Sequence, residues 1–469
     1  MSEVKRGRRS RNGQVGTGPE LDGPARSFTT TRRQLLYGVA GAGIVSVLVP
    51  TIGWTEAAAA QTDASSSTST RPWTFWISSF DGETLSLTGL QPNGGVIATG
   101  LNVPIITQRS PSGSILISAD IAGDASSSAH RLVMRSAYDG TILRQILGKT
   151  DAVAAGDKVV GHELALAISA DGDYAAVLDT AWSTAGQRKA LKLGPKAVPG
   201  REELVVDLSS ATSIEVFDLS GAVPVGHQLL TSGALSPNCG FAGQSVLATW
   251  MEPGPAQEVK VLSQSARSVG SAPMHPVSSA GMTSATGLQQ SRSGLWAQSV
   301  GFDTIQFVNS SLKAGQVRVF PADWGAAKPY PTRLIGIGDS GLLVVNCGIP
   351  AAAIVQGNDA HVASAALLAN QAGNPRLSMG QWSADATETH LYVADSSPRQ
   401  GGVWVYELPS LRLVDRWLSS TAFAAVSCSP DGSTIFAIAR ERPLVFSITP
   451  EGRTVAATEL PKQPSGIID

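Results

Sequence analysis

Ala422–Ala439 reads AFAAVSCSPDGSTIFAIA, and this stretch decides the fold that we expect for the chain. Two runs of small, aliphatic and aromatic residues flank Pro430, Asp431 and Gly432. Proline fixes φ, aspartate hydrogen-bonds to its own backbone, and glycine accepts a positive φ, so the three residues suit a tight hairpin turn. The stretch therefore predicts two short antiparallel strands.

The following residues complete a four-strand unit that recurs along the chain. RPLVFSITPEGRTVAATEL at 442–460 predicts a third strand, a glycine turn and a fourth strand. HLYVAD at 390–395 with GGVWVYELPSLRLVDRWL at 401–418 matches this unit, as does DYAAVLD at 173–179 with SIEVFDLSGAVPVGHQLL at 213–230. Outside the N-terminal segment, the one helix-like candidate is DAHVASAALLANQ at 359–371, which suits a strand equally well.

A turn phrase repeats with the unit. It reads SPSG at Ser110, SADG at Ser169, SPNCG at Ser236, SRSG at Ser291, GDSG at Gly338, SADA at Ser383 and SPDG at Ser429. The later steps are about 45–50 residues, which is the range of propeller blades. These phrases, with VFDLSG and VYELPS, resemble the WD40-like and YVTN-type bacterial β-propellers over about 73–469. The resemblance implies an all-β propeller of four-stranded antiparallel blades and implies no specific function, and the Trp-Asp endings of WD40 repeats are missing.

The number of blades follows from counting strands. Three predicted strands, at 73–79, 83–89 and 95–101, precede the first turn phrase, and seven four-strand units follow it. LPKQPSGIID at 460–469 predicts one further inner strand, which would complete an eighth blade with the three N-terminal strands. We expect eight blades, with seven as the alternative because the units between 236 and 325 are poorly patterned. The long insertion at 180–211 is expected to connect two blades, and long loops on rigid scaffolds often carry function.

The first 60 residues have the pattern of an export signal. A basic, polar segment precedes TRRQLL at 31–36, an uncharged run extends from Leu35 to Trp54, and Ala58 and Ala60 supply an A-x-A cleavage site before Gln61. The adjacent Arg32 and Arg33, followed by Leu35 and Leu36, resemble the twin-arginine export signal. This resemblance implies the twin-arginine export machinery as a partner and folding before export, sometimes with cofactor loading.

The sequence thus divides into a signal segment at 1–60, a flexible linker at 61–72 and a propeller at 73–469. The apolar run of about 20 residues could instead remain as an uncleaved anchor, because that length spans a bilayer. The propeller would be exported in either case, either secreted or associated with the cell envelope, and would touch the membrane only through this N-terminal segment.

Several residues resemble chemical motifs without completing them. Gly338–Gly341 reads GDSG, as around the nucleophile of chymotrypsin-like proteases, but the phrase lies in phase with the other turns and we expect Ser340 to be a turn residue. Asp171 and Asp173 lack the further ligands of a calcium loop. The six histidines form no ligand pair along the sequence, and Cys239, Cys347 and Cys428 form no metal or haem motif. No catalytic, cofactor or metal residues are therefore predicted.

The expected function is a binding role, because no residue set matches a catalytic motif. A formal charge of −2 gives no electrostatic case for nucleic acid. We expect an exported propeller that binds a protein, peptide or glycan at the cell envelope. The alternatives are a propeller enzyme, either lactonase-like or quinoprotein dehydrogenase-like, and an electron-transfer scaffold. An enzyme predicts several acidic or histidine side chains that converge at one channel mouth with shifted pKa values, whereas a binding module predicts an apolar or aromatic patch on one face. The cofactor and the ligand remain open.

Overall fold

The computed structural model describes residues 73–468, all within one compact unit of the chain. Short stretches inside this range lie outside the description: 82–83, 105, 125–126, 152–158, 184–187, 193–202, 208–210, 232–234, 252–256, 275–285, 291–295, 302–303, 309–310, 312–313, 321–332, 338–340, 347–350, 357–359, 369–382 and 398–400. The elements in the described residues are β-strands joined by turns, so the all-β prediction is confirmed.

These strands form eight four-stranded antiparallel sheets and one separate two-stranded hairpin. From the inner to the outer strand, the sheets are β34 (Gly466–Ile468), β1 (Phe75–Asp81), β2 (Thr84–Leu90) and β3 (Val96–Val103); β4 (Ile106–Arg109), β5 (Ile115–Asp124), β6 (Ser127–Ser136) and β7 (Ile142–Asp151); β8 (Val159–Ile168), β9 (Tyr174–Ser183), β12 (Ala211–Asp218) and β13 (Val223–Thr231); β14 (Leu235–Ala242), β15 (Ser245–Met251), β16 (Gln257–Leu262) and β17 (Ser268–Met274); β18 (Thr286–Gln290), β19 (Trp296–Gly301), β20 (Thr304–Val308) and β21 (Ala314–Arg318); β22 (Arg333–Ile337), β23 (Gly341–Asn346), β24 (Ala351–Gln356) and β25 (His361–Leu367); β26 (Ser383–Ala386), β27 (His390–Asp395), β28 (Gly402–Glu407) and β29 (Arg412–Trp417); and β30 (Phe423–Cys428), β31 (Ile435–Ala439), β32 (Leu444–Ile448) and β33 (Thr454–Glu459). The hairpin consists of β10 (Arg188–Lys192) and β11 (Glu203–Asp207).

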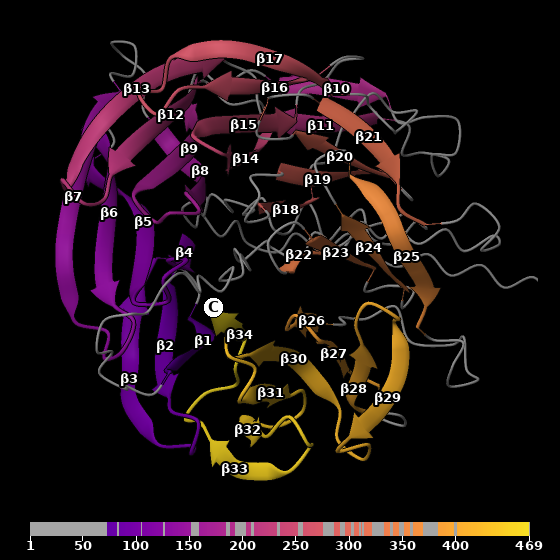
Figure 1. Cartoon of the computed structure of the whole chain (residues 1–469). Coiled ribbons are helices and arrows are strands. Elements are labelled where there is room, and N and C mark those ends of the chain that lie inside the picture. The colour runs from indigo at the N-terminus through magenta and orange to yellow at the C-terminus, as the bar shows by residue number, and fades with distance from the viewer. Residues whose placement is uncertain are drawn as a thin grey trace, which may run out of the picture. The chain divides into compact units, whose positions relative to one another are not determined.

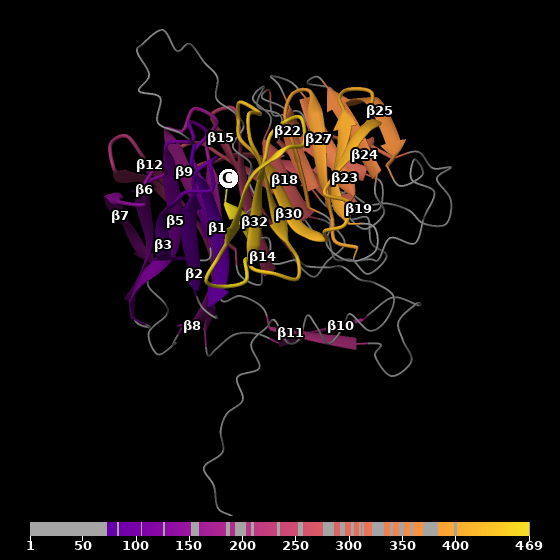
Figure 2. The same ribbon diagram turned by 90° about the horizontal axis from the view of Figure 1, so that it is seen from below.

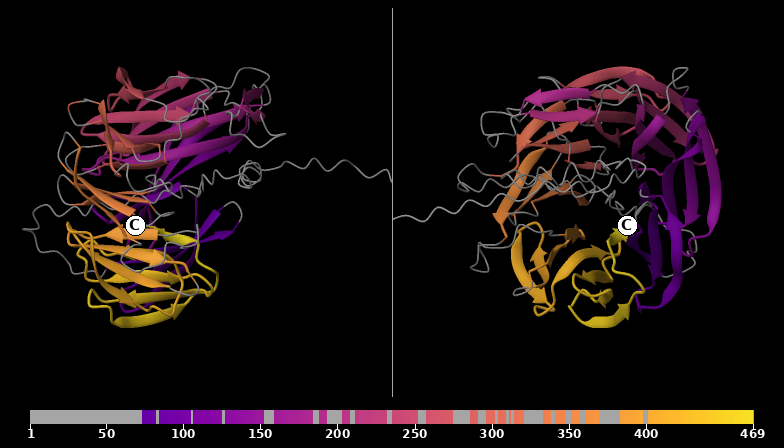
Figure 3. Two further views of the ribbon diagram at one scale, coloured as in Figure 1. Left: turned by 90° about the vertical axis from the view of Figure 1, so that its right-hand side faces the viewer. Right: turned by 180° about the vertical axis from the view of Figure 1, so that it is seen from behind.

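The sheets follow one another around a ring, as Figures 1 and 3 show. The inner strands contact one another in the circle β34, β4, β8, β14, β18, β22, β26, β30 and back to β34. Figure 2 shows the sheets side on, standing next to one another as blades. Seven blades each use one part of the chain, and the eighth joins its two ends, in agreement with the strand count made from the sequence.

The eighth blade closes the ring as the sequence predicts. β34 pairs antiparallel with β1, so that Ile468 lies opposite Trp76 and Gly466 opposite Ser78. Trp76 Nε1 donates to the carbonyl of Ala137 in the next blade at 2.7 Å, and Phe75 stacks on Phe436 of the preceding blade with ring centroids 4.0 Å apart. The closing blade is therefore fastened on both sides.

The hydrophobic core lies between the blades. One buried cluster, for example, combines Ile117 and Leu132 of the blade β4–β7 with Val177 and Phe217 of the next blade. Other clusters of buried residues, among those described, join further pairs of neighbouring blades in the same way. Strand faces that pack on neighbouring sheets explain why many strands are apolar along their whole length.

Three of the predicted turn phrases form the same hairpin turn. In SPSG, SADG and SPDG, the serine hydroxyl accepts from the amide five residues on, and the glycine amide donates to the serine carbonyl: Ser110, Gly113 and Ile115; Ser169, Gly172 and Tyr174; and Ser429, Gly432 and Thr434. The glycine φ angles are +71°, +78° and +67°, in the region where a Cβ is unfavourable.

Two other phrases do not form turns. SPNCG lies within β14, whose turn follows at Gly243 and Gln244, and SADA forms β26, whose turn begins at Thr387. Their residues can extend as strands because neither phrase places glycine at its fourth position. SRSG and Gly338–Ser340 lie outside the described residues, although β22 and β23 pair across the latter as predicted.

We expect Gly172→Ala to lower the free energy of unfolding by about 1–2 kcal/mol, because only the positive φ opposes the new methyl group. A Cβ at Gly172 meets nothing closer than 3.9 Å. The matched control is Gly161→Ala in the same blade, where φ is not in the positive region and a Cβ meets nothing within 4 Å. Urea unfolding should separate the two variants. Equal stability would contradict this explanation of the turn.

The long insertion was assigned to the wrong position. It leaves the second strand of a blade at Ser183, forms β10 and β11, and returns to the third strand at Ala211, so it lies within the blade and does not connect two blades. The pairing of β9 with β12 requires this, because Thr180 and Ala181 continue β9. The helix-like segment at 359–371 is a strand in its described part, β25.

The proposed signal segment and linker, 1–60 and 61–72, lie outside the described residues. Within the described residues, no helix has the length and apolar character needed to span a membrane.

Candidate functional site

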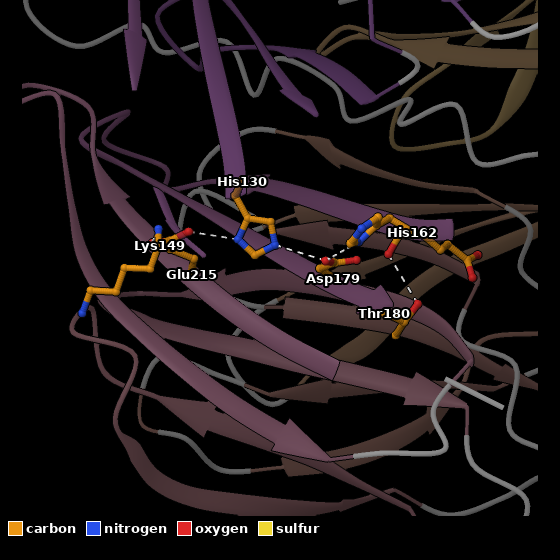
Figure 4. Close-up of polar contacts among 7 residues, drawn as sticks. His130, Lys149, His162, Asp179, Thr180 and Glu215 are labelled. Carbon is orange, nitrogen blue, oxygen red and sulfur yellow. Dashed lines mark hydrogen bonds and ion pairs between the residues drawn. The ribbon is translucent and has the colours of Figure 1, made fainter. Parts of the chain in front are cut away.

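Four ionisable side chains meet between two neighbouring blades. His130 of β6 comes from the blade β4–β7, while His162 of β8, Asp179 of β9 and Glu215 of β12 come from the next blade, here called β8–β13. Figure 4 shows His130 between the two carboxylates, with His162 beyond Asp179. We call this place the His130 seam.

His130 bridges both carboxylates. Its Nδ1 lies 2.9 Å from Glu215 Oε2, and its Nε2 lies 3.3 Å from Asp179 Oδ2. The same Asp179 oxygen lies 2.8 Å from His162 Nδ1. The side chains of His130 and Asp179 are 4% and 5% exposed and that of Glu215 is fully buried, whereas 17% of the His162 side chain is exposed. The network therefore runs from the surface into the interior.

Strand alternation places these groups together. Asp179 pairs with Ser213, two residues before Glu215 on β12, so both carboxylates project from the same face of their sheet. Val177 and Phe217 follow on that face and belong to the apolar cluster shared with the blade β4–β7. The seam is thus a polar continuation of the interblade core.

The charged groups of the seam stabilise one another's ionised forms and shift one another's pKa values. Burial lowers the pKa of His130, but hydrogen bonds to Asp179 and Glu215 and their negative charges outweigh it and raise the pKa to about 9. Burial raises the pKa of Asp179, but hydrogen bonds and charges from the two histidines outweigh this effect and leave the pKa below its ordinary value. At neutral pH the seam therefore holds an imidazolium between two carboxylates.

The outer strand β7 leaves room for Glu215. The Lys149 amide donates to Glu215 Oε1 at 2.7 Å, and a Cβ on Gly148 would overlap the Glu215 carboxylate. Glycine at 148 thus allows β7 to approach the buried carboxylate, and the amide of the next residue stabilises it.

We expect Gly148→Ala to destabilise the protein by about 1–3 kcal/mol, because the methyl group must displace the Glu215 carboxylate, which hydrogen bonds to His130 and the Lys149 amide hold in place. Gly270→Ala, on the outer strand β17, is the matched control, since a Cβ there meets nothing within 4 Å. Combining Gly148→Ala with Glu215→Ala should give less than the sum of the two separate losses, as measured by thermal unfolding. Additive losses would show that the overlap does not matter.

The chemistry open to the seam is proton exchange. Within the described residues, no group of three or more histidine, cysteine and acidic side chains has an arrangement that could hold a metal ion. The partly exposed His162 connects the buried pair to the surface through Asp179. The arrangement therefore offers proton exchange and charge pairing between blades.

The residues named in the sequence analysis do not come together in one site within the described residues. Arg32, Arg33, Leu35, Leu36, Ala58, Ala60 and Ser340 lie outside the described residues. Asp171 accepts from the Ser169 hydroxyl and from the Asp173 amide, as a turn residue does. Cys239 is a free, buried thiol, and burial raises its pKa to about 12.

Sequence reasoning missed the convergence at the seam. His130 is 49 residues from Asp179 and 85 from Glu215, so no local spacing connects them. One signal was available in the sequence. Glu215 lies among the apolar residues Ile214, Val216 and Phe217 of a predicted strand, and a charged side chain buried there requires a partner.

A second feature is an apolar surface on three adjoining outer strands. Of the eleven exposed large hydrophobic residues among those described, seven lie on β7, β13 and β17: Ile142, Leu143, Leu147, Val223, Val225, Leu229 and Val269. β7 contacts β13, and Gln228 Nε2 of β13 donates to Ser268 Oγ of β17, so the three strands are neighbours. Figure 1 shows them in succession along the rim. We call these seven residues the outer-strand surface.

Comparison with known proteins gives structural likeness alone. No family model matches the chain, and no curated protein matches it. Among solved structures, the dihydro-heme d1 dehydrogenase NirN aligns with a TM-score of 0.49 and 11% identity over 84% of this chain and 75% of that one.

Two further structures are similar. The BamB protein of Moraxella catarrhalis aligns with a TM-score of 0.42 and 11% identity over 73% of this chain and 87% of its own. The WD40 repeats of RRP9 align with a TM-score of 0.39 and 13% identity, over 71% of this chain and 92% of that one. These likenesses concern the fold and assign no ligand or activity.

Proposed function

We propose that this chain is an exported β-propeller that binds a protein partner at the cell envelope, through the outer-strand surface. The observation that carries the proposal is the concentration of exposed aliphatic residues on β7, β13 and β17. Large apolar side chains exposed on neighbouring strands cost solvation free energy, and surface regions rich in them mark interaction sites.

The backbone of these strands supports a protein partner. β7, β13 and β17 are each the last strand of their sheet, and in the described residues no further strand pairs with their outer edges. An extended segment of a partner could add to such an edge by main-chain hydrogen bonds, while alternate apolar side chains select it. Leu143 and Leu147 of β7 are 51% and 61% exposed.

The residue types favour a protein over a glycan. The exposed side chains are aliphatic, whereas glycan sites commonly use aromatic rings for stacking. Among the tryptophans with described side chains, Trp73 and Trp182 are partly buried and none is fully exposed; the buried ones are Trp76, Trp250, Trp404 and Trp417. An extended apolar peptide therefore fits the surface better than a sugar.

Photo-crosslinking in a twin-arginine-competent host tests the docking surface. A crosslinking amino acid would replace Leu147 or Leu229, with Val414 on β29 and Val455 on β33 as controls on exposed outer strands elsewhere. We expect one discrete crosslinked protein from the first two positions and none from the controls. Leu143→Lys should weaken that crosslink roughly tenfold or more, since a buried leucine contributes about 1.5–3 kcal/mol. Equal labelling at all four positions would overturn the proposed surface.

The export part of the proposal rests on the basic, apolar and small-residue pattern of residues 1–60. Changing both Arg32 and Arg33 to lysine is expected to retain the full-length protein in the cytoplasm. The same change at Arg8 and Arg9, the other adjacent arginine pair of the segment, is the control and should leave export intact. Export of both variants at the wild-type level would rule out the twin-arginine route.

A further inference from the structure

The position of His130 requires two ring protons. Nδ1 faces the Glu215 carboxylate and Nε2 faces the Asp179 carboxylate. A neutral imidazole carries one N–H, so one of its nitrogens would present a lone pair to a carboxylate oxygen. Only the imidazolium donates on both sides, and the geometry of the closed seam is therefore that of a protonated His130.

Loss of that proton leaves buried carboxylates short of donors. Among the described residues, Glu215, which is fully buried, would keep only the Lys149 amide as a donor if the remaining N–H turned to Asp179. Asp179 already has one oxygen, Oδ1, that is buried without a hydrogen-bond partner. Buried charges without donors are costly, and entry of water between the blades would satisfy them.

We propose that the His130 seam is a proton-controlled joint, which protonated His130 holds closed and which opens when His130 loses its proton. The groups that face His130 are Asp179 of β9 and Glu215 of β12, with His162 of β8 behind Asp179 and the Lys149 main chain of β7 behind Glu215. Arg131, the next residue of β6, pairs with Asp120 of its own blade. The pKa of His130, raised to about 9, agrees with a joint that is closed at neutral pH.

The joint has a route to solvent. His162 is 17% exposed at its side chain and shares an Asp179 oxygen with His130. A proton can therefore leave His130 through Asp179 and His162 without complete separation of the blades.

The joint also controls the position of β7 against its neighbour. Gly148 and Lys149 of β7 contact Glu215, and Glu215 pairs with His227 of β13. Opening would therefore shift β7 relative to β13, the two strands that carry most of the outer-strand surface. The consequence for partner binding rests on the proposed function, whereas the joint itself does not.

Histidine-selective NMR of the exported protein tests the protonation state. We expect one of the six imidazole signals to keep its protonated chemical shift until about pH 9, and we expect His130→Gln to remove that signal. In Glu215→Gln the transition should move to lower pH. If all imidazoles titrate between about pH 6 and 7.5, close to the ordinary histidine value, the joint is excluded.

Hydrogen exchange tests the opening. After correction for the intrinsic pH dependence of exchange, protection of the peptide covering 142–151 should fall about tenfold or more between pH 7 and pH 10. His130→Gln should show the low protection at both pH values, and His390→Gln should behave as wild type. The peptide covering 412–417, on the outer strand of another blade, is the internal control.

Two results would overturn the proposal. A wild-type protein whose protection at 142–151 does not change with pH would show that deprotonation opens nothing. A variant His130→Gln that still changes with pH would assign the change to another group. Because neither measurement involves a partner, both can succeed even if the outer-strand surface binds nothing.

Discussion

Replacing His130 with leucine is expected to lower the free energy of unfolding by about 3–5 kcal/mol, the cost of removing one partner from a buried ionic network. The variant leaves the Asp179 and Glu215 carboxylates, which project from one face of the same sheet, without the cation that lies between them. The lost volume adds little, because leucine and histidine are similar in size. Urea unfolding at pH 7 measures the difference from wild type.

His390→Leu is the matched control, because in the described residues His390 of β27 bridges no pair of carboxylates and its Nδ1 lies 2.9 Å from the hydroxyl of the exposed Thr389. We expect that change to cost about 1 kcal/mol or less. Replacing Glu215 with methionine in addition to His130→Leu should recover part of the loss, since one buried charge is then removed. If His130→Leu costs no more than the control, the imidazolium does not hold the seam.

The His130 effect should depend on pH in a defined direction. The pKa of His130 is about 9 in the folded protein and about 6.5 when unfolded, so folding takes up a proton between these values. Its stabilisation is fully present below about pH 6.5 and decreases as the pH rises through about 9, in total by about 3 kcal/mol. On the acid side, the lowered pKa of Asp179 means that stability also decreases as the pH falls through that pKa.

Removing residues 466–469 is expected to abolish cooperative folding. The deletion takes away β34, with the buried Ile467 and Ile468 and the hydrogen-bonded pairing with β1. Each buried isoleucine contributes about 2 kcal/mol or more, and the loss also exposes the inner edge of β1. The total approaches the whole stability of a typical domain, which is about 5–15 kcal/mol.

Deleting Asp469 alone is the control, because it lies beyond β34 and should leave thermal unfolding close to wild type. Size-exclusion chromatography together with circular dichroism would distinguish the two proteins. A monomeric, cooperatively unfolding protein without residues 466–469 would show that the remaining seven blades close the ring by themselves.

The architecture could be predicted because short sequence patterns determine its turns and strands. SPDG at Ser429 and SADG at Ser169 specify hairpin turns through a serine, an aspartate and a glycine at fixed spacing, and the strands on either side alternate or run apolar as blades require. The sharing of one blade between the two ends followed from counting strands. SPNCG at Ser236 misled, because serine and proline without a glycine at the fourth position permit an extended strand.

The seam could not be predicted in the same way. Its four residues come from four strands, and which pairs of residues face each other depends on the register between β9 and β12 and on the packing of two blades. A single sequence fixes neither quantity. The position of the insertion was missed for a related reason, since only the pairing of β9 with β12 shows that Thr180 and Ala211 belong to one sheet.

The closing blade also sets a waiting time during synthesis. Ser78 of β1 and Ser465, which immediately precedes β34, hydrogen-bond to each other across 387 residues of sequence, the kind of distant contact that slows folding. At translation rates of about 5–20 residues per second, β1 remains without its inner neighbour for roughly 20–80 s after it leaves the ribosome. During this interval the three N-terminal strands offer a free edge to any other extended chain, so a nascent molecule needs protection from its neighbours until residue 466 emerges.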